Sequence, residues 1–302
     1  MLKMNAQTGN NMFQYAACKT LADKKGYKFC FRGGKKGSLF EDFELSGETK
    51  FSLFWQRFFY ELNPFSRKRL FRFKQTPFSS TKLHELIEPE FFDLKDGYTV
   101  QGTFQSEYYF KDNRNNILRW FTPRVHYREQ VKNIEDEINI PIEKRCCIHV
   151  RRSDYQAMEE KKDGLGWLLP IAYYQEALKN LPEDLFYIII SDDPDFAAQV
   201  FEQLPNKYIS RNNPAVVDMH LLTRCRYNIL ANSTFSWWGG WLNDNENKVI
   251  IAPEYNLGWP DESWFPYKIK VAEWQYINVN KALKNYGKIQ VFNPIDSHFK
   301  TL

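Results

Sequence analysis

The chain has 302 residues, of which 43% are hydrophobic and 26% charged, a composition typical of a soluble globular protein rather than a disordered one. The formal net charge of +4 is too small to indicate a nucleic-acid-binding protein, and no apolar run approaches the roughly 18 residues that a membrane-spanning helix needs. Residues 1–5 lack the apolar core of a signal peptide, and the five cysteines show no C-x-x-C spacing or His cluster for a zinc site. We therefore expect a cytoplasmic protein with reduced cysteines.

The first 140 residues predict an irregular α/β domain. Their pattern predicts a helix over 12–24 that stops at Gly26, strands over 27–31 and 98–104, and a charged helix over 127–138. The Gly- and Lys-rich residues 32–38 lack the spacing of a phosphate-binding loop, so we expect an exposed turn there. We place a domain boundary near Pro141, which divides the chain into domains 1–140 and 141–302.

The second half alternates short apolar runs with helical patterns. A strand over 146–150 is followed by a buried strand over 185–190, after which Asp193 is placed to cap a helix that starts with Pro194. Further strands are predicted over 207–210, 227–231 and 249–251, and helices over 216–225 and 235–242. Repeated strand and helix units of this kind predict a parallel sheet with helices on both faces.

Polar residues follow the strand 146–150, at the end of a strand where an open α/β sheet binds its ligands. The segment reads His149-Val150-Arg151-Arg152-Ser153-Asp154-Tyr155. One arginine could hold a phosphate in a bidentate contact while the other pairs with a carboxylate such as Asp154. A structural ion pair at the strand end explains the same residues equally well.

A second polar segment, Asn232 to Trp241 (NSTFSWWGGW), follows the strand 227–231. Hydroxyl residues at a helix start leave free backbone N–H groups and the positive end of the helix dipole, which together bind anions. Ser233, Thr234 and Ser236 would add side-chain donors. The alternative is that Ser233 or Thr234 only caps the helix and that the tryptophans fill the core.

Asp218 lies near the start of the predicted helix 216–225. A carboxylate can accept two parallel hydrogen bonds from the N–H edge of guanine, although helix capping by Asp218 is an alternative. We interpret His220, on the same helix, as a structural histidine.

These segments resemble the motifs of bacterial α-1,2-fucosyltransferases, glycosyltransferase family 11. Residues 149–155 resemble the family's H-V-R-R-G-D-Y motif, and residues 235–242 (FSWWGGWL) resemble F-S-W-W-G-A-W-L. Residues 9–16 (GNNMFQYA) resemble its G-N-Q-M-F-Q-Y-A opening, and residues 102–110 (GTFQSEYYF) resemble G-Y-F-Q-S-E-K-Y-F. The motifs keep their order from about Gly9 to about Trp259.

The resemblance implies a GT-B-like α/β fold, in which two Rossmann-like domains face a cleft and the C-terminal one binds the nucleotide. It implies GDP-β-L-fucose as a donor substrate, the 2-hydroxyl of a terminal galactose on a glycan as acceptor, inversion at the anomeric carbon, no metal ion and no cofactor. A leaving GDP gains negative charge, which fixed cations and helix N–H groups stabilise. The donor-binding residues implied are His149, Arg151, Asp218, Ser233, Thr234, Ser236, Asn10 and Gln14.

Inversion calls for a base that takes the proton of the acceptor hydroxyl. Asp154 is the first candidate and Glu159 the second, followed by Glu160 and Glu107; alternatively, Asp154 only orients the arginines. The expected catalytic set is therefore Asp154, Arg151 and Glu159. Residues 193–195 have the form of a D-x-D metal motif, but a helix start explains them better.

The sequence departs from the family pattern in three places. Residues 1–8 are short and polar, so the first strand is expected to be missing or altered, and Asn11 and Ser153 replace the family's Gln and Gly. The altered N-terminus leaves open a non-catalytic nucleotide- or glycan-binding relative, and the H-x-R-R-x-D pattern leaves open a second alternative, a fucosyltransferase of another linkage. The F-S-W-W-G segment speaks against the second.

Basic and aromatic residues gather between Phe51 and Lys74. We interpret this segment as packing beside the acceptor cleft or making a peripheral contact with the inner membrane. An ordinary amphipathic helix and a nucleic-acid contact are the alternatives.

Overall fold

The computed structural model describes residues 2–4, 7–29, 31–33, 39–45, 58, 72–74, 89–161 and 163–288. The chain forms two compact units, Met1–Arg124 with Tyr267–Ile269, and Val125–Pro266 with Lys270–Leu302. Because the second unit begins at Val125, it includes the helix that precedes Pro141. Within the described ranges no helix is long and apolar enough to cross a membrane.

The first unit contains a parallel sheet with the strand order β2-β1-β4-β3. Its strands are β1 (Leu2–Met4), β2 (Phe31–Gly33), β3 (Arg72–Lys74) and β4 (Thr99–Gln101). Its helices are α1 (Thr8–Lys25), α2 (Leu39–Asp42), α5 (Pro89–Phe92) and α6 (Arg114–Trp120), with 3₁₀ turns η1 (Glu107–Tyr109) and η2 (Lys111–Asn113) before α6.

Aromatic side chains fill the core of this unit around helix α1. Tyr15 is fully buried, and its ring makes edge contacts with Phe29, Phe31 and Trp120 at centroid distances of 5.4, 5.5 and 5.7 Å. The helix ends as predicted at Gly26, whose φ of +67° is left-handed and is adopted by glycine without strain.

The structure corrects three expectations for the first unit. The first strand is present as β1, which pairs with β2 on one side and β4 on the other, because backbone groups form a ladder whatever the polarity of the side chains. Residues 27–29 are not a strand, and the strand starts at Phe31 instead. Arg32 and Gly33 belong to that strand and not to a turn, whereas residues 34–38 lie outside the described residues. Of the basic aromatic segment, only Phe58 and β3 lie inside them.

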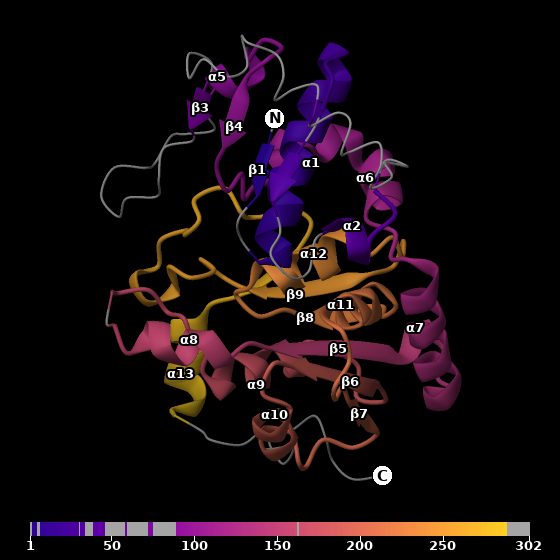
Figure 1. The fold of residues 1–302 in the computed structure, drawn as a ribbon. Coiled ribbons are helices and arrows are strands. Elements are labelled where there is room, and N and C mark those ends of the chain that lie inside the picture. Colours follow the sequence, from indigo (N-terminus) through magenta and orange to yellow (C-terminus); the bar gives the residue numbers. More distant parts are fainter. Residues whose placement is uncertain are drawn as a thin grey trace. The chain divides into compact units, whose positions relative to one another are not determined.

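The second unit contains a parallel sheet with the strand order β10-β9-β8-β5-β6-β7. Its strands are β5 (Arg145–Val150), β6 (Phe186–Ser191), β7 (Lys207–Ile209), β8 (Tyr227–Ile229), β9 (Val249–Pro253) and β10 (Gln275–Ile277). Its helices are α7 (Val125–Ile138), α8 (Ser153–Glu159), α9 (Ile171–Lys179), α10 (Pro194–Val200), α11 (Ala215–Thr223), α12 (Thr234–Leu242) and α13 (Val279–Tyr286), with 3₁₀ turns η3 (Ile142–Lys144) and η4 (Trp259–Asp261). Figure 1 shows the strands side by side with helices packed around them.

The strand order gives this unit the doubly wound topology. From β5 the chain adds β6 and β7 on one side and then returns to add β8, β9 and β10 on the other. The order therefore reverses between β5 and β8, and sheets of this kind bind ligands outside the carboxyl ends of the strands at that reversal. The parallel sheets of the two units confirm the predicted α/β class.

Alternation along β5 decides which of its side chains face which layer. Cys146, Ile148 and Val150 pack in the apolar cluster that includes α9, where Tyr173 is fully buried. His149 lies on the opposite face, where its ring is 5.2 Å from that of Phe235 on α12. The predicted elements of this half are all present, with ends that differ by one or two residues.

Candidate functional site

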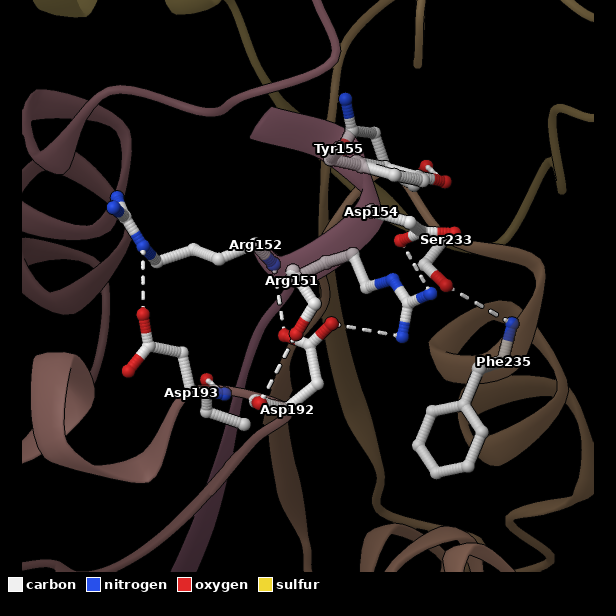
Figure 2. A network of polar contacts seen from close by, with 11 residues as sticks. Arg151, Arg152, Asp154, Tyr155, Asp192, Asp193, Ser233 and Phe235 are labelled. Carbon is white, nitrogen blue, oxygen red and sulfur yellow. Dashed lines mark hydrogen bonds and ion pairs between the residues drawn. The ribbon is translucent and has the colours of Figure 1, made fainter. Parts of the chain in front are cut away.

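Arg151 lies directly after β5, and two carboxylates hold its guanidinium group in place. Nη2 is 2.6 Å from Oδ1 of Asp154, and Nη1 is 3.0 Å from Oδ2 of Asp192, which follows the neighbouring strand β6 (Figure 2). The guanidinium carbon also lies 5.3 Å from the centre of the Tyr155 ring. Within the described part of the chain, the buried Nε of Arg151 has no hydrogen-bond partner. The predicted Arg–Asp ion pair is therefore present, and Nη1 and Nη2 of Arg151 each keep one N–H group outside these two contacts.

Arg152 turns away from Arg151 and anchors the start of α10. Its guanidinium carbon lies 3.5 Å from the centre of the Phe196 ring, and its Nε is 3.3 Å from Oδ2 of Asp193. Asp193 Oδ1 accepts a hydrogen bond from the backbone N–H of Phe196, which confirms the predicted helix start at Pro194. Figure 2 shows the two arginines pointing in opposite directions, as we expected from their adjacent positions.

His149 is a buried, neutral side chain. Burial, assisted by the positive charge of Arg151, lowers the pKa of His149 to about 3. Its Nδ1 atom is buried and has no hydrogen-bond partner among the residues described. Because neutral imidazole offers one donor and one acceptor, this ring can bind a polar ligand group without bringing a charge.

The turn after β8 places hydroxyl side chains at the start of α12. Ser233 is the N-cap residue, and its Oγ accepts a hydrogen bond from the N–H of Phe235 at 3.3 Å. Thr234 is half-buried in the first turn of the helix. Ser236 is fully buried, and its hydroxyl donates to the carbonyls of Ala231 and Ser233, so its side chain supports the turn from inside.

The tryptophans of this segment belong to the core, as one interpretation predicted. Trp237, Trp238 and Trp241 are at most 4% exposed, and Trp237 and Trp241 stack at a centroid distance of 6.0 Å. They pack α12 into the core, and because α12 follows β8 it starts at the carboxyl end of the sheet, where Arg151 follows β5.

Asp218 does not cap helix α11, since the N-cap residue is Pro214. Its Oδ1 instead accepts a hydrogen bond from Ser210 Oγ at 2.5 Å. Burial raises the pKa of Asp218 to about 6, while hydrogen bonds from Ser210 and Asn213 oppose the rise. His220 has the structural role we expected, with Nδ1 3.0 Å from Thr223 Oγ1.

Glu159, the second candidate base, accepts two backbone hydrogen bonds. Its Oε2 lies 2.9 Å from the N of Trp167 and 3.2 Å from the N of Leu168. Asp154 accepts from Arg151 with Oδ1, which agrees with the orienting role that we considered for it.

In the first unit, Asn10 and Gln14 connect two of the motifs. Asn10 Oδ1 accepts a hydrogen bond from Gln105 Nε2 at 2.8 Å, and Gln14 Nε2 donates to the carbonyl of Gly102 at 2.7 Å. Gln14 is 4% exposed, and its Oε1 has no partner among the described residues. The structure therefore brings residues 9–16 and 102–110 together on one side of α1.

Asp192 and the Tyr155 hydroxyl were absent from the predicted set of site residues, whereas Asn232 is the first residue of the predicted segment 232–241. Asp192 holds Arg151, the Tyr155 hydroxyl donates to the carbonyl of Asn232 at 3.2 Å, and the Asn232 amide donates to Gly166. Asp192 follows a predicted strand, so the rule that ligands bind at strand ends could have selected it. The contacts of Tyr155 and Asn232 depend on packing that the sequence pattern does not specify.

Chemically, the end of this sheet combines a fixed cation, the N-terminus of a helix and a buried neutral imidazole. Such a set stabilises negative charge that develops on a phosphate, because its donors need no reorganisation. Among the described residues no group of three or more His, Cys, Asp or Glu side chains could hold a metal ion.

The parallel sheet and the anion-binding groups at its end suit a protein that binds a nucleotide, and sequence comparison specifies the class. The profile of glycosyl transferase family 11 matches residues 3–278, and the chain belongs to that family.

The chain is also similar to proteins of Escherichia coli and human. The O-antigen biosynthesis glycosyltransferase WbnK of Escherichia coli is 28% identical over 193 residues, which are 60% of this chain and 62% of WbnK. The α-1,2-colitosyltransferase of Escherichia coli is 27% identical over 263 residues, 81% of this chain and 88% of the relative. Human galactoside α-(1,2)-fucosyltransferase 1 is 24% identical over 302 residues, 91% of this chain and 74% of the relative.

Proposed function

We propose that this protein transfers L-fucose from GDP-β-L-fucose to the 2-hydroxyl of a terminal galactose on a glycan, with inversion and without a metal ion. One observation carries the proposal: the segment 149–155 spans the end of β5 and the start of α8, and the segment 232–236 leads from β8 into α12. The order of the parallel sheet reverses between β5 and β8. Both segments match motifs of the family, and the galactoside linkage is the one in the name of the human relative.

In this proposal the second unit binds the GDP group. Arg151 grips the β-phosphate with the donors that its two carboxylates leave available, and the N–H groups at the start of α12 contact the pyrophosphate. Asp218 accepts the N–H groups of guanine, since a carboxyl group with a pKa of about 6 is largely ionised at pH 7. These groups stabilise the charge that GDP gains as the bond to fucose breaks.

Asp154 is the first candidate for the base. Its contact with Arg151 supports two roles, proton acceptor and orienting partner, and replacement by Asn separates them. Loss of kcat by a factor of about 10² to 10⁴ with little change in donor KM would indicate a base, whereas a rise in donor KM would indicate orientation.

The test is release of GDP from GDP-fucose, with a panel of β-galactosides as acceptors and excess EDTA present. We expect turnover in the wild type and in Arg211→Ala, an exposed arginine paired with Asp195, but not in Arg151→Ala. GDP binding without turnover would point to the non-catalytic relative, and turnover that stops in EDTA would refute the metal-free mechanism. Products whose linkage is not α-1,2 would establish the fucosyltransferase of another linkage.

A second donor is favoured by one relative. Because the α-1,2-colitosyltransferase aligns with 81% of this chain, colitose is an alternative sugar for the same linkage. Competition between GDP-fucose and GDP-colitose, measured as the ratio of kcat/KM values, decides between them.

A further inference from the structure

Helix α8 carries Tyr155 and Glu159 four residues apart, on the same face. The Tyr155 hydroxyl donates to the carbonyl of Asn232, the residue before the N-cap of α12, at 3.2 Å. Glu159 Oε2 accepts from the backbone N–H groups of Trp167 and Leu168. One helix therefore contacts both the turn after β8 and the loop 163–168.

The loop and the turn are also bonded to each other. The buried Asn232 Nδ2 donates to the carbonyls of Gly166 at 2.6 Å and Trp167 at 3.2 Å. Helix α8, the loop and the turn thus form a closed circuit of hydrogen bonds. The edge contact of the Trp167 ring with the Tyr155 ring, at a centroid distance of 5.1 Å, lies inside that circuit.

A second anchor fixes the loop from its other side. The Gly166 N–H donates to the carbonyl of Leu257 at 2.9 Å, and the indole N–H of Trp259 donates to the Gly166 carbonyl at 2.9 Å. A Cβ atom at Gly166 would lie 1.9 Å from Trp259 Nε1, so only glycine allows this close approach. The loop backbone is consequently held at one position.

Tyr155 connects this set of hydrogen bonds to the candidate donor site. The Tyr155 ring, fixed by its hydroxyl and by Trp167, lies 5.3 Å from the guanidinium carbon of Arg151. The carbonyl that accepts from the Tyr155 hydroxyl belongs to the residue that precedes Ser233. Displacement of α8 would therefore change the distance between Arg151 and the start of α12, the two groups proposed to hold the diphosphate.

We propose that Glu159 is a positioning residue and not the catalytic base, and that Tyr155, Glu159 and Asn232 together set the spacing of the two donor-binding segments. This inference rests on the proposed function and assigns to Glu159 a role different from the one its sequence suggested. The carboxylate acts by accepting hydrogen bonds from two backbone N–H groups, so an uncharged amide oxygen in the same place keeps both contacts.

Conservative substitutions distinguish the two roles of Glu159. Glu159→Gln keeps an oxygen that accepts both N–H groups but removes the basic carboxylate, and we expect kcat and the pH profile of kcat to stay within about twofold of the wild type. Glu159→Ala and Tyr155→Phe each lose part of the circuit, and we expect donor KM and the Kd for GDP to rise about tenfold, the scale of one lost hydrogen bond. Glu202→Ala, which replaces an exposed glutamate between α10 and β7, is the control.

The opposite pattern would overturn the inference. A base at Glu159 predicts that Glu159→Gln lowers kcat by about 10² to 10⁴ with donor KM retained and removes the acidic limb of the pH profile. Equal GDP affinity in Tyr155→Phe, Glu159→Ala and wild type would also refute the positioning role.

Hydrogen exchange at the amides of Trp167 and Leu168 supplies a readout that does not depend on turnover. Exchange should accelerate in Glu159→Ala and stay slow in Glu159→Gln, and unchanged exchange in Glu159→Ala would refute the circuit itself. If the wild type binds no GDP, the proposed function fails; if the wild type is active and only the Glu159 pattern is reversed, the inference fails alone.

Discussion

Asp192 contacts three consecutive residues after β5, so its replacement should change the position of Arg151 and weaken GDP binding. Its Oδ2 lies 3.0 Å from Arg151 Nη1, its Oδ1 accepts from the N–H of Arg152 at 2.8 Å, and its carbonyl accepts from the Ser153 hydroxyl. In Asp192→Asn the amide oxygen can keep the contact with Arg152, but the amide nitrogen then faces a guanidinium N–H, so two donors oppose each other.

The magnitude follows from the exposure of the pair. A hydrogen bond between charged groups contributes about 1.5–3 kcal/mol, and we take the lower end because the side chains of Arg151 and Asp192 are 19% and 20% exposed. A loss of about 1.5 kcal/mol lowers the Tm of a unit of this size by about 3–6 °C. Displacement of Arg151 should weaken GDP binding about tenfold.

Thermal unfolding with and without GDP, together with calorimetric GDP titration, measures both effects. The matched control is Asp195→Asn, because Asp195 also pairs with an arginine but its side chain is 87% exposed, and such pairs contribute little. If Asp192→Asn and Asp195→Asn had the same Tm and GDP Kd, the argument that Asp192 holds Arg151 in a binding geometry would be refuted.

Three further predictions follow from buried groups near the site. Burial raises the pKa of Asp218 to about 6, so the contribution of Asp218 to folding stability decreases as pH rises from about 3.8 to 6. Asp218→Asn should therefore raise the free energy of unfolding at pH 7, measured by chemical denaturation, and weaken GDP binding, measured by titration. The lowered pKa of His149, about 3, contributes folding stability at neutral pH that is lost as pH falls from 6.5 toward 3. Denaturation at several pH values should therefore show a smaller decrease in the free energy of unfolding for His149→Gln than for the wild type over that pH range. Gly166→Ala should lower the free energy of unfolding by about 1–3 kcal/mol, because the added methyl group overlaps the Trp259 indole; an unchanged denaturation midpoint would contradict this.

Periodicity predicted β5, β6 and β8 because these strands are almost wholly buried, whereas β10, which is exposed or half-buried, and the helices α8, α9 and α13 were not predicted. β5 is buried along its whole length, and Asp193 with Pro194 marks the start of α10 as the sequence indicated. The first unit was harder to predict, since β1 is a three-residue strand whose pairing partners β2 and β4 come from distant parts of the chain. Its register depends on backbone pairing that no local pattern reveals.

In the candidate site, too, local sequence patterns predicted some residues, whereas the contacts between distant segments could not be predicted. Motif order and strand ends were enough to select Arg151, His149 and Ser233. The partners that hold them, such as Asp192 and Asn232, act through hydrogen bonds that close only when β6, the loop 163–168 and α12 are assembled. The role of Glu159 shows the difference most clearly, because its chemistry suggested a base and its contacts suggest an anchor.

The link between Asn10 and Gln105 also has a consequence for biosynthesis. These residues are 95 positions apart, and Gln14 and Gly102 are 88 apart. A chain emerging from the ribosome has made the whole of α1 long before the residues that bind it exist, and contacts at such long separation form slowly. Until residues 102–120 have been synthesised, α1 lacks the partners of Asn10 and Gln14 and also the Trp120 ring that packs on Tyr15. Its apolar side chains are exposed during that interval, so this is when the nascent protein should depend most on chaperones.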